Sequence, residues 1–97
     1  MSKSLFDKRR IYEALKNKLK IDFRDSRELV GWYYLDGKKT NRFTIPKGRG
    51  TITPGYQKAI EKKSRLNNED FERLIICPMG GPEYDDKMRE LVRNRLL

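Results

Sequence analysis

Histidine is absent from this 97-residue chain, and cysteine occurs only once, at Cys77. Without an imidazole, the chain has neither the side chain that most readily exchanges protons near neutral pH nor a histidine ligand for a metal ion. A single cysteine excludes an intramolecular disulfide framework and a cysteine-rich zinc site. We therefore expect no metal and no cofactor, and we assign no catalytic residue.

Long apolar segments are missing too. No run approaches the roughly 20 residues that cross a bilayer, and the N-terminal MSKSLFDKRR lacks the apolar stretch of a signal peptide. We expect a cytoplasmic protein with no membrane partner. Hydrophobic residues make up 36% of the chain and charged residues 38%. This composition and length suit one small domain, residues 1–97, with a modest core.

Positive charge is abundant and unevenly distributed. The net charge is +9, and residues 1–65 carry 18 Lys/Arg against 7 Asp/Glu, whereas residues 66–97 carry 5 against 7. A basic body attracts phosphate groups because binding releases counterions condensed on the nucleic acid. The alternative is a solvated, highly charged surface of the kind that heat-stable proteins favour. We favour nucleic acid, since a merely solvated surface would more often mix both signs.

Apolar periodicity predicts four helices, over residues 4–20, 53–66, 68–76 and 82–97. Thr53-Pro54 is typical of a helix start, with Thr as the N-cap and Pro at the first helical position. The first two helices belong to a core of about residues 1–66. The last two form a C-terminal helical extension of about residues 67–97.

Three short strands are predicted between the first two helices, over residues 28–35, 40–46 and 51–53, with a hairpin turn at Asp36-Gly37. Because one face of the sheet must pack against helices, we expect Trp32 and Tyr34 to be buried and Tyr33 to be exposed. If Trp32 and Tyr34 face solvent instead, single-stranded nucleic acid becomes the preferred ligand. The fold class is α+β.

An α-β-β-β-α order with a basic turn and a basic second helix is that of double-stranded RNA-binding domains. Within it, LDGKKTNRFTIP followed by PGYQKAIEKKSRLNNEDFERLI resembles the HicA toxin family, small ribonucleases of toxin–antitoxin systems with a dsRBD-like fold. The resemblance covers roughly residues 28–90. It implies a dsRBD-like core with a three-stranded antiparallel sheet, extra C-terminal helices and an RNA partner.

The chain departs from this family at the catalytic position. HicA-type enzymes share a Gly-Ser-His segment on the first strand, whose histidine carries RNA cleavage. In this chain Val30 stands at that position or, if a gap is allowed, Tyr33. The valine side chain exchanges no proton. The pKa of an ordinary tyrosine, about 10, is too high for it to act as an efficient general base at neutral pH. The resemblance therefore implies binding without cleavage.

Candidate nucleic-acid-binding residues cluster around the predicted turns and on the second helix. Cations near turns are free to follow phosphates, and Lys58 and Lys62 share one face of the helix. The alternative is a hairpin whose lysines only block edge pairing. We include Tyr33 as an exposed aromatic contact. The full set is Lys38, Lys39, Arg42, Lys47, Arg49, Lys58, Lys62, Lys63 and Tyr33.

Acidic residues before and at the hairpin could be imagined as a metal-assisted nuclease site, but no spacing among Asp22, Asp25, Glu28 and Asp36 matches a known ligand pattern. We expect these carboxylates to be solvated or ion-paired. The function hypothesis is a small basic protein that binds double-stranded or structured RNA without cutting it. Two alternatives stay open: an inhibitor that binds a protein partner through the same fold, and a ribonuclease toxin with relocated catalytic groups.

Overall fold

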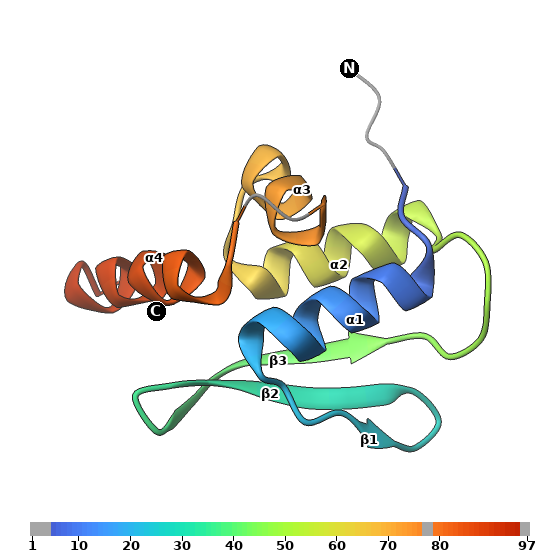
Figure 1. Ribbon diagram of the computed structural model, residues 1–97, viewed down its shortest axis with the longest axis horizontal. Helices are drawn as coiled ribbons and strands as arrows, with labels where there is room; N and C mark the ends of the chain where they lie inside the picture. Colours follow the sequence, from blue (N-terminus) through green and yellow to red (C-terminus); the bar gives the residue numbers. More distant parts are fainter. Residues whose placement is uncertain (1–4, 77–78, 96–97) are drawn as a thin grey trace.

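The structure, a computed structural model, describes residues 5–76 and 79–95. Its elements are α1 (Lys8–Leu19), β1 (Arg24–Asp25), β2 (Leu29–Leu35), β3 (Lys38–Ile45), α2 (Pro54–Ser64), α3 (Asn68–Ile76) and α4 (Gly81–Arg93). The strands form one antiparallel sheet in the order β1-β2-β3, and the helices of the described chain lie on one side of it (Figure 1). The predicted α+β class and the element order are confirmed. The predicted end of the last helix, residues 96–97, lies outside the described residues.

The prediction of a third strand at residues 51–53 is wrong. After β3, Pro46 has no N–H to donate, and Gly48 and Gly50 adopt left-handed φ angles of 105° and 100°, which turn the chain toward α1. There Thr51 forms a bridge with Asp7, and the Ile52 N–H donates to the Phe6 carbonyl at 2.9 Å. The third strand is instead Arg24–Asp25, which has no apolar alternation to reveal it because both residues are exposed.

The hairpin turn forms where Asp36-Gly37 predicts it. Leu35 pairs with Lys38, so two residues make the loop, and both have positive φ, 51° at Asp36 and 84° at Gly37. Two positive φ angles define the type I′ turn, which matches the twist of the flanking strands. Glycine accepts this conformation without steric cost.

A bulge at Thr40 brings Tyr33 and Phe43 onto the same face of the hairpin. Beside the turn Tyr34 pairs with Lys39, but Tyr33 pairs with Asn41, so Thr40 is the extra residue on β3. An unbroken register would continue with Tyr33 opposite Thr40. The one-residue shift instead brings Phe43 opposite Gly31, and it puts Tyr33 on the core face with Phe43.

The prediction for the aromatic run is therefore wrong. Tyr33 is 1% exposed, whereas Trp32 is 36% and Tyr34 52% exposed. Both faces of β2 carry apolar side chains, so alternation alone did not decide between them. Ala59, on the second helix, is also exposed.

The core lies between the sheet and the helices, and Tyr84 of α4 joins three of its elements. Its ring meets that of Tyr33 edge to face, with centroids 4.9 Å apart. Its hydroxyl accepts a hydrogen bond from Asn41 Nδ2 and donates one to the Ser64 carbonyl, each at 2.8 Å. Other fully buried side chains come from every layer: Ile11, Leu15, Phe43, Ile45, Ile52, Ile60, Phe71, Leu74 and Met88. No helix of the described residues has the length and apolar character needed to cross a membrane.

Candidate nucleic-acid interface

Two aromatic rings and two cations share the outer face of the sheet. Trp32 is directly opposite Arg42 in the register, and Tyr34 is opposite Lys39. Lys39 Nζ lies 5.3 Å from the centre of the Trp32 ring, within the range of a cation–π interaction. No described helix covers this face, because the helices pack on the opposite side (Figure 1). Proteins that bind single-stranded nucleic acids combine exposed aromatic rings with cations in this way.

The Thr40 bulge makes this arrangement possible. Lys39 and Arg42 are three residues apart, and in a regular strand such residues point to opposite faces. The extra residue restores both side chains to the outer face, where each pairs with an aromatic of β2. Thr40 itself satisfies its hydroxyl locally, donating from Oγ1 to the Lys38 carbonyl at 3.0 Å. Bulges that re-aim side chains are frequent beside functional sites.

A groove of about 540 Å³ runs over this face. The segment between α1 and β2 forms one wall, and the outward side chains of β2 and β3 form the rest. None of the cations that line it takes part in an ion pair with a described residue. The charged and aromatic lining consists of Lys20, Arg24, Lys39 and Arg42, one acid, Asp22, and the rings of Trp32 and Tyr34. We refer to it as the sheet groove.

A smaller groove of about 140 Å³ follows the edge of β3, where α2 packs alongside. Arg42 and Thr44 contribute from the strand, and Tyr56, Ala59, Ile60 and Lys63 contribute from the helix. Arg42 lines both grooves. We refer to the second one as the edge groove.

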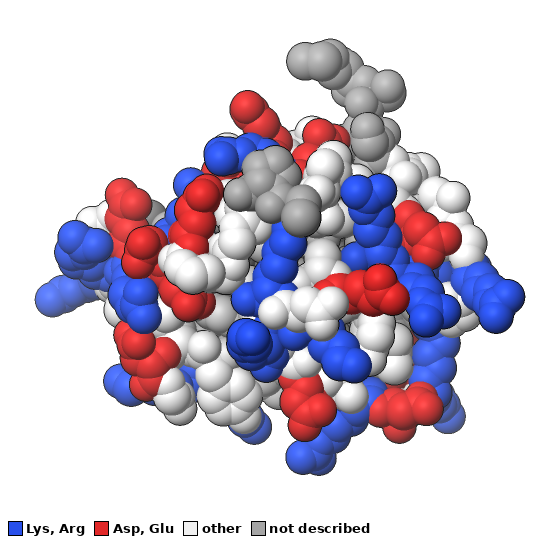
Figure 2. All heavy atoms as spheres, viewed as in Figure 1, with Lys and Arg blue, Asp and Glu red and all other residues white. Residues whose placement is uncertain are grey.

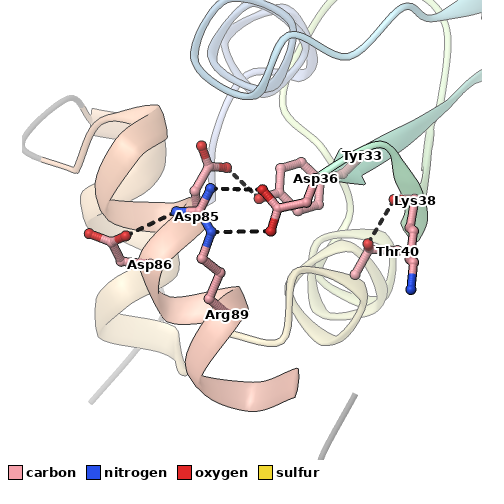
Figure 3. A network of polar contacts seen from close by, with 7 residues as sticks. All are labelled: Tyr33, Asp36, Lys38, Thr40, Asp85, Asp86 and Arg89. Atoms are coloured by element: carbon pink, nitrogen blue, oxygen red, sulfur yellow. Dashed lines mark hydrogen bonds and ion pairs between the residues drawn. The ribbon is translucent and has the colours of Figure 1, made fainter. Parts of the chain in front are cut away.

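Helix α4 holds the turn end of the hairpin in place (Figure 3). Arg89 Nη2 and Nε contact the two carboxylate oxygens of Asp36 at 3.0 and 3.3 Å, and Arg89 Nη1 contacts Asp86 at 3.1 Å. The hydroxyl of Tyr33 donates to Asp85. Because these contacts flank Tyr34 and Lys39, they fix the strand positions that carry the sheet groove.

The Arg89 hydrogen bond lowers the pKa of Asp36. A depressed folded-state pKa means that this pair contributes stability above the ordinary carboxyl pKa of about 3.9 and loses it as the pH falls through the folded value. Both groups are exposed, so the contribution to the free energy of unfolding is small. Its main effect is on the position of the turn.

The other predicted contact residues are dispersed. Lys47 is ion-paired with Asp25, and Arg49 lines a separate groove beside Lys8 and Arg9 of α1. Lys38, Lys58 and Lys62 are exposed but line neither groove. Figure 2 shows Lys and Arg interspersed with Asp and Glu over the face seen there. Of the predicted cations, only Lys39, Arg42 and Lys63 gather along the two grooves.

Tyr33 cannot be a surface contact. Its ring lies in the core and its hydroxyl donates to Asp85, so it presents no face to a base. Sequence reasoning missed Lys20, Arg24 and Tyr56, and it placed Trp32 and Tyr34 on the wrong face. Three consecutive rings cannot all point inward, so at least one must be exposed, but this count does not decide which face of β2 carries the exposed rings.

Two carboxylates weighed as metal ligands are ion-paired, Asp25 with Lys47 and Asp36 with Arg89. Among the described residues, no three Cys, Asp or Glu side chains come together in a way that could hold a metal ion. A scan against protein-family models and searches of curated proteins and of solved structures find no match to this chain. The site is therefore interpreted from its own geometry.

Alkaline titration tests the packing beneath this face. Burial away from water is the main reason that the pKa values of Tyr33 and Tyr84 are raised, and the hydrogen bond to Asp85 adds to the shift at Tyr33. A raised folded-state pKa gives stability that is complete below the unfolded value of about 10 and is lost as the pH rises above it. We expect phenolate absorbance from two of the five tyrosines to appear only as the chain unfolds. Full phenolate absorbance with a native circular dichroism spectrum would contradict this.

Proposed function

We propose that this protein binds single-stranded RNA, or unpaired segments of structured RNA, in the sheet groove and does not cleave it. The observation that carries the proposal is the pairing of exposed Trp32 and Tyr34 with Arg42 and Lys39 on an uncovered sheet face. Bases stack on the rings and the cations contact the phosphates.

The spacing of the two rings supports this ligand. Trp32 and Tyr34 are two residues apart on one strand, which separates their Cα atoms by about 6–7 Å. An extended strand with its bases unstacked can place neighbouring bases on neighbouring rings, whereas a duplex keeps its bases paired and presents only their edges. Lys39 Nζ lies 5.3 Å from the centre of the Trp32 ring, so a base that stacks on this ring displaces the ammonium group, which can then contact the neighbouring phosphate.

In this proposal the protein is a HicA-like, dsRBD-like chain that binds RNA but has lost the family's catalytic group. The Asp36-Gly37 hairpin and the element order α-β-β-β-α agree with the likeness, but Val30 and Tyr33, which the resemblance places on the first strand, lie on the second. Tyr33, which a gapped register puts at the catalytic position, has a raised pKa and is hydrogen-bonded to Asp85, so it does not act as a base near neutral pH. The dispersal of Lys38, Lys47 and Arg49 favours a single strand over the duplex expected from the sequence.

Trp32 is the only tryptophan of the chain, so its fluorescence reports stacking directly. We expect single-stranded RNA to quench it, and the binding constant to fall with salt at a logarithmic slope of about −3 if the four cations of the sheet groove each neutralise one phosphate. The titration should include single-stranded DNA and duplex RNA of the same sequence, and the RNA should be recovered intact.

The other outcomes favour specific alternatives. Tighter binding of duplex RNA without quenching would contradict the sheet groove and favour duplex recognition. Cleaved RNA would favour the ribonuclease. No binding to any nucleic acid, together with a stable protein complex, would favour the inhibitor.

A further inference from the structure

We propose that the bound RNA strand continues from the sheet groove over the edge of β3 and that the edge groove holds the following unpaired nucleotide. This inference rests on the proposed function and specifies its ligand: a flexible strand longer than the two nucleotides that Trp32 and Tyr34 engage. Tyr56 supplies a ring, and Arg42 and Lys63 supply positive charge.

Continuity between the two grooves comes from Arg42. Its side chain lies on the outer face opposite Trp32, and it also lines the edge groove together with Thr44. A guanidinium has five N–H donors in a planar fork, so one Arg42 side chain can contact two successive phosphates or one phosphate at two points. An RNA strand that runs from Trp32 toward the edge groove meets no acidic side chain among the residues lining that groove.

The helical wall of the edge groove is built for a flat ligand. Tyr56, Ala59 and Lys63 are spaced i, i+3 and i+7, which aligns them in one stripe along α2. Ala59 is exposed and small, and it leaves open space between the half-buried ring of Tyr56 and the exposed Lys63. Buried Ile60 forms the floor. Along this stripe the groove presents an aromatic ring, then a recess, then a cation. This order suits a base followed by its phosphate.

Only a single strand can follow this path. The molecule measures 37 × 34 × 21 Å, whereas duplex DNA stays straight over a persistence length of about 500 Å. A duplex resting on the sheet would pass the edge of β3 as a rod and leave the edge groove empty. An unpaired strand bends at each nucleotide.

The test is a length series of single-stranded RNA titrated against the Trp32 fluorescence of wild type and of Ala59→Leu, which fills the recess without touching the sheet groove. Asn17→Leu is the matched control, because it adds the same apolar side chain at an exposed position of α1 that lines neither groove. Short oligonucleotides that cover only Trp32 and Tyr34 should bind wild type and both variants alike.

Longer oligonucleotides should separate the variants. We expect the wild-type affinity to rise about 5- to 150-fold, the equivalent of one further stacked base, once the strand reaches the edge groove. Ala59→Leu should lose this rise, and Asn17→Leu should keep it. Lys63→Gln should reduce the salt slope by about 0.7 for long strands only.

The two proposals fail in different ways. Quenching by short strands, with no effect of Ala59→Leu or Lys63→Gln on long ones, overturns the edge groove and leaves the sheet groove standing. Absence of quenching at every length overturns both.

Discussion

Replacing both Trp32 and Tyr34 with alanine is expected to weaken the binding of single-stranded RNA by at least about 30-fold, because each base stacked on an aromatic ring contributes about 1–3 kcal/mol. The two rings are exposed, so their removal leaves the core intact. Since the fluorescent reporter is lost with Trp32, binding should be followed by the anisotropy of a labelled oligonucleotide. Tyr34→Ala alone retains the reporter and should give an intermediate loss.

Ile76→Ala provides the matched control for this variant. Ile76 is an exposed apolar side chain on α3, which packs on α1 and α2 and lies in the helical layer (Figure 1). Its removal should leave RNA affinity unchanged. An RNA affinity of the double variant within a factor of two of wild type, with the fold intact by circular dichroism, is inconsistent with a stacking site on the sheet.

Local signals were sufficient to predict the helices and the hairpin, but not the short strand Arg24–Asp25. The hairpin turn followed from Asp36-Gly37, because few other pairs accept two positive φ angles. The start of α2 followed from Thr53-Pro54, and the four helices followed from the spacing of their apolar residues. Each of these signals depends on neighbours in the chain, which a sequence displays directly.

The faces of the sheet were not predictable in the same way. Thr40 carries no signal that distinguishes a bulge from a regular strand position, yet the bulge decides whether Phe43 shares a face with Trp32 or with Tyr33. Which face of β2 is buried depends on contacts from other segments. Ile21 and Phe23 pack against the backbone of Gly31, and the ring of Tyr84 packs against the ring of Tyr33. Tertiary packing overrides alternation when both faces are apolar.

The sequence indicated that cations and aromatic rings would be candidate contact residues, but it indicated only part of where they lie. Basic character and the expectation of a phosphate-bearing ligand followed from the charge of residues 1–65. Which cations gather depended on the bulge and on the packing of α2 beside β3, so Lys39, Arg42 and Lys63 come together while Lys47 pairs with Asp25. The departure of the chain from β3 toward α1 sends Arg49 to another surface.

The substitution Gly81→Ala is expected to destabilise the fold by about 1–3 kcal/mol, the usual cost of forcing an extra methyl group into a packed site. A Cβ at Gly81 would lie 2.1 Å from the Lys18 carbonyl oxygen. Because that atom belongs to the backbone of α1, it cannot rotate away, and α4 must shift. For a domain of this size, each kcal/mol lowers Tm by about 4–8 °C.

Gly55→Ala is the matched control, since it makes the same change in the first turn of another helix. A Cβ at Gly55 meets nothing within 4 Å, and its φ is not left-handed. Here alanine reduces the conformational freedom of the unfolded chain, so we expect unchanged or slightly higher stability, by up to about 1 kcal/mol. Urea unfolding should therefore give a lower midpoint for Gly81→Ala and a midpoint equal to or slightly above that of wild type for Gly55→Ala. Equal midpoints would show that α4 does not pack against the end of α1 as closely as the structure has it. The anchoring of the hairpin turn through Arg89 and Asp36 would then need another explanation, because it depends on the position of α4.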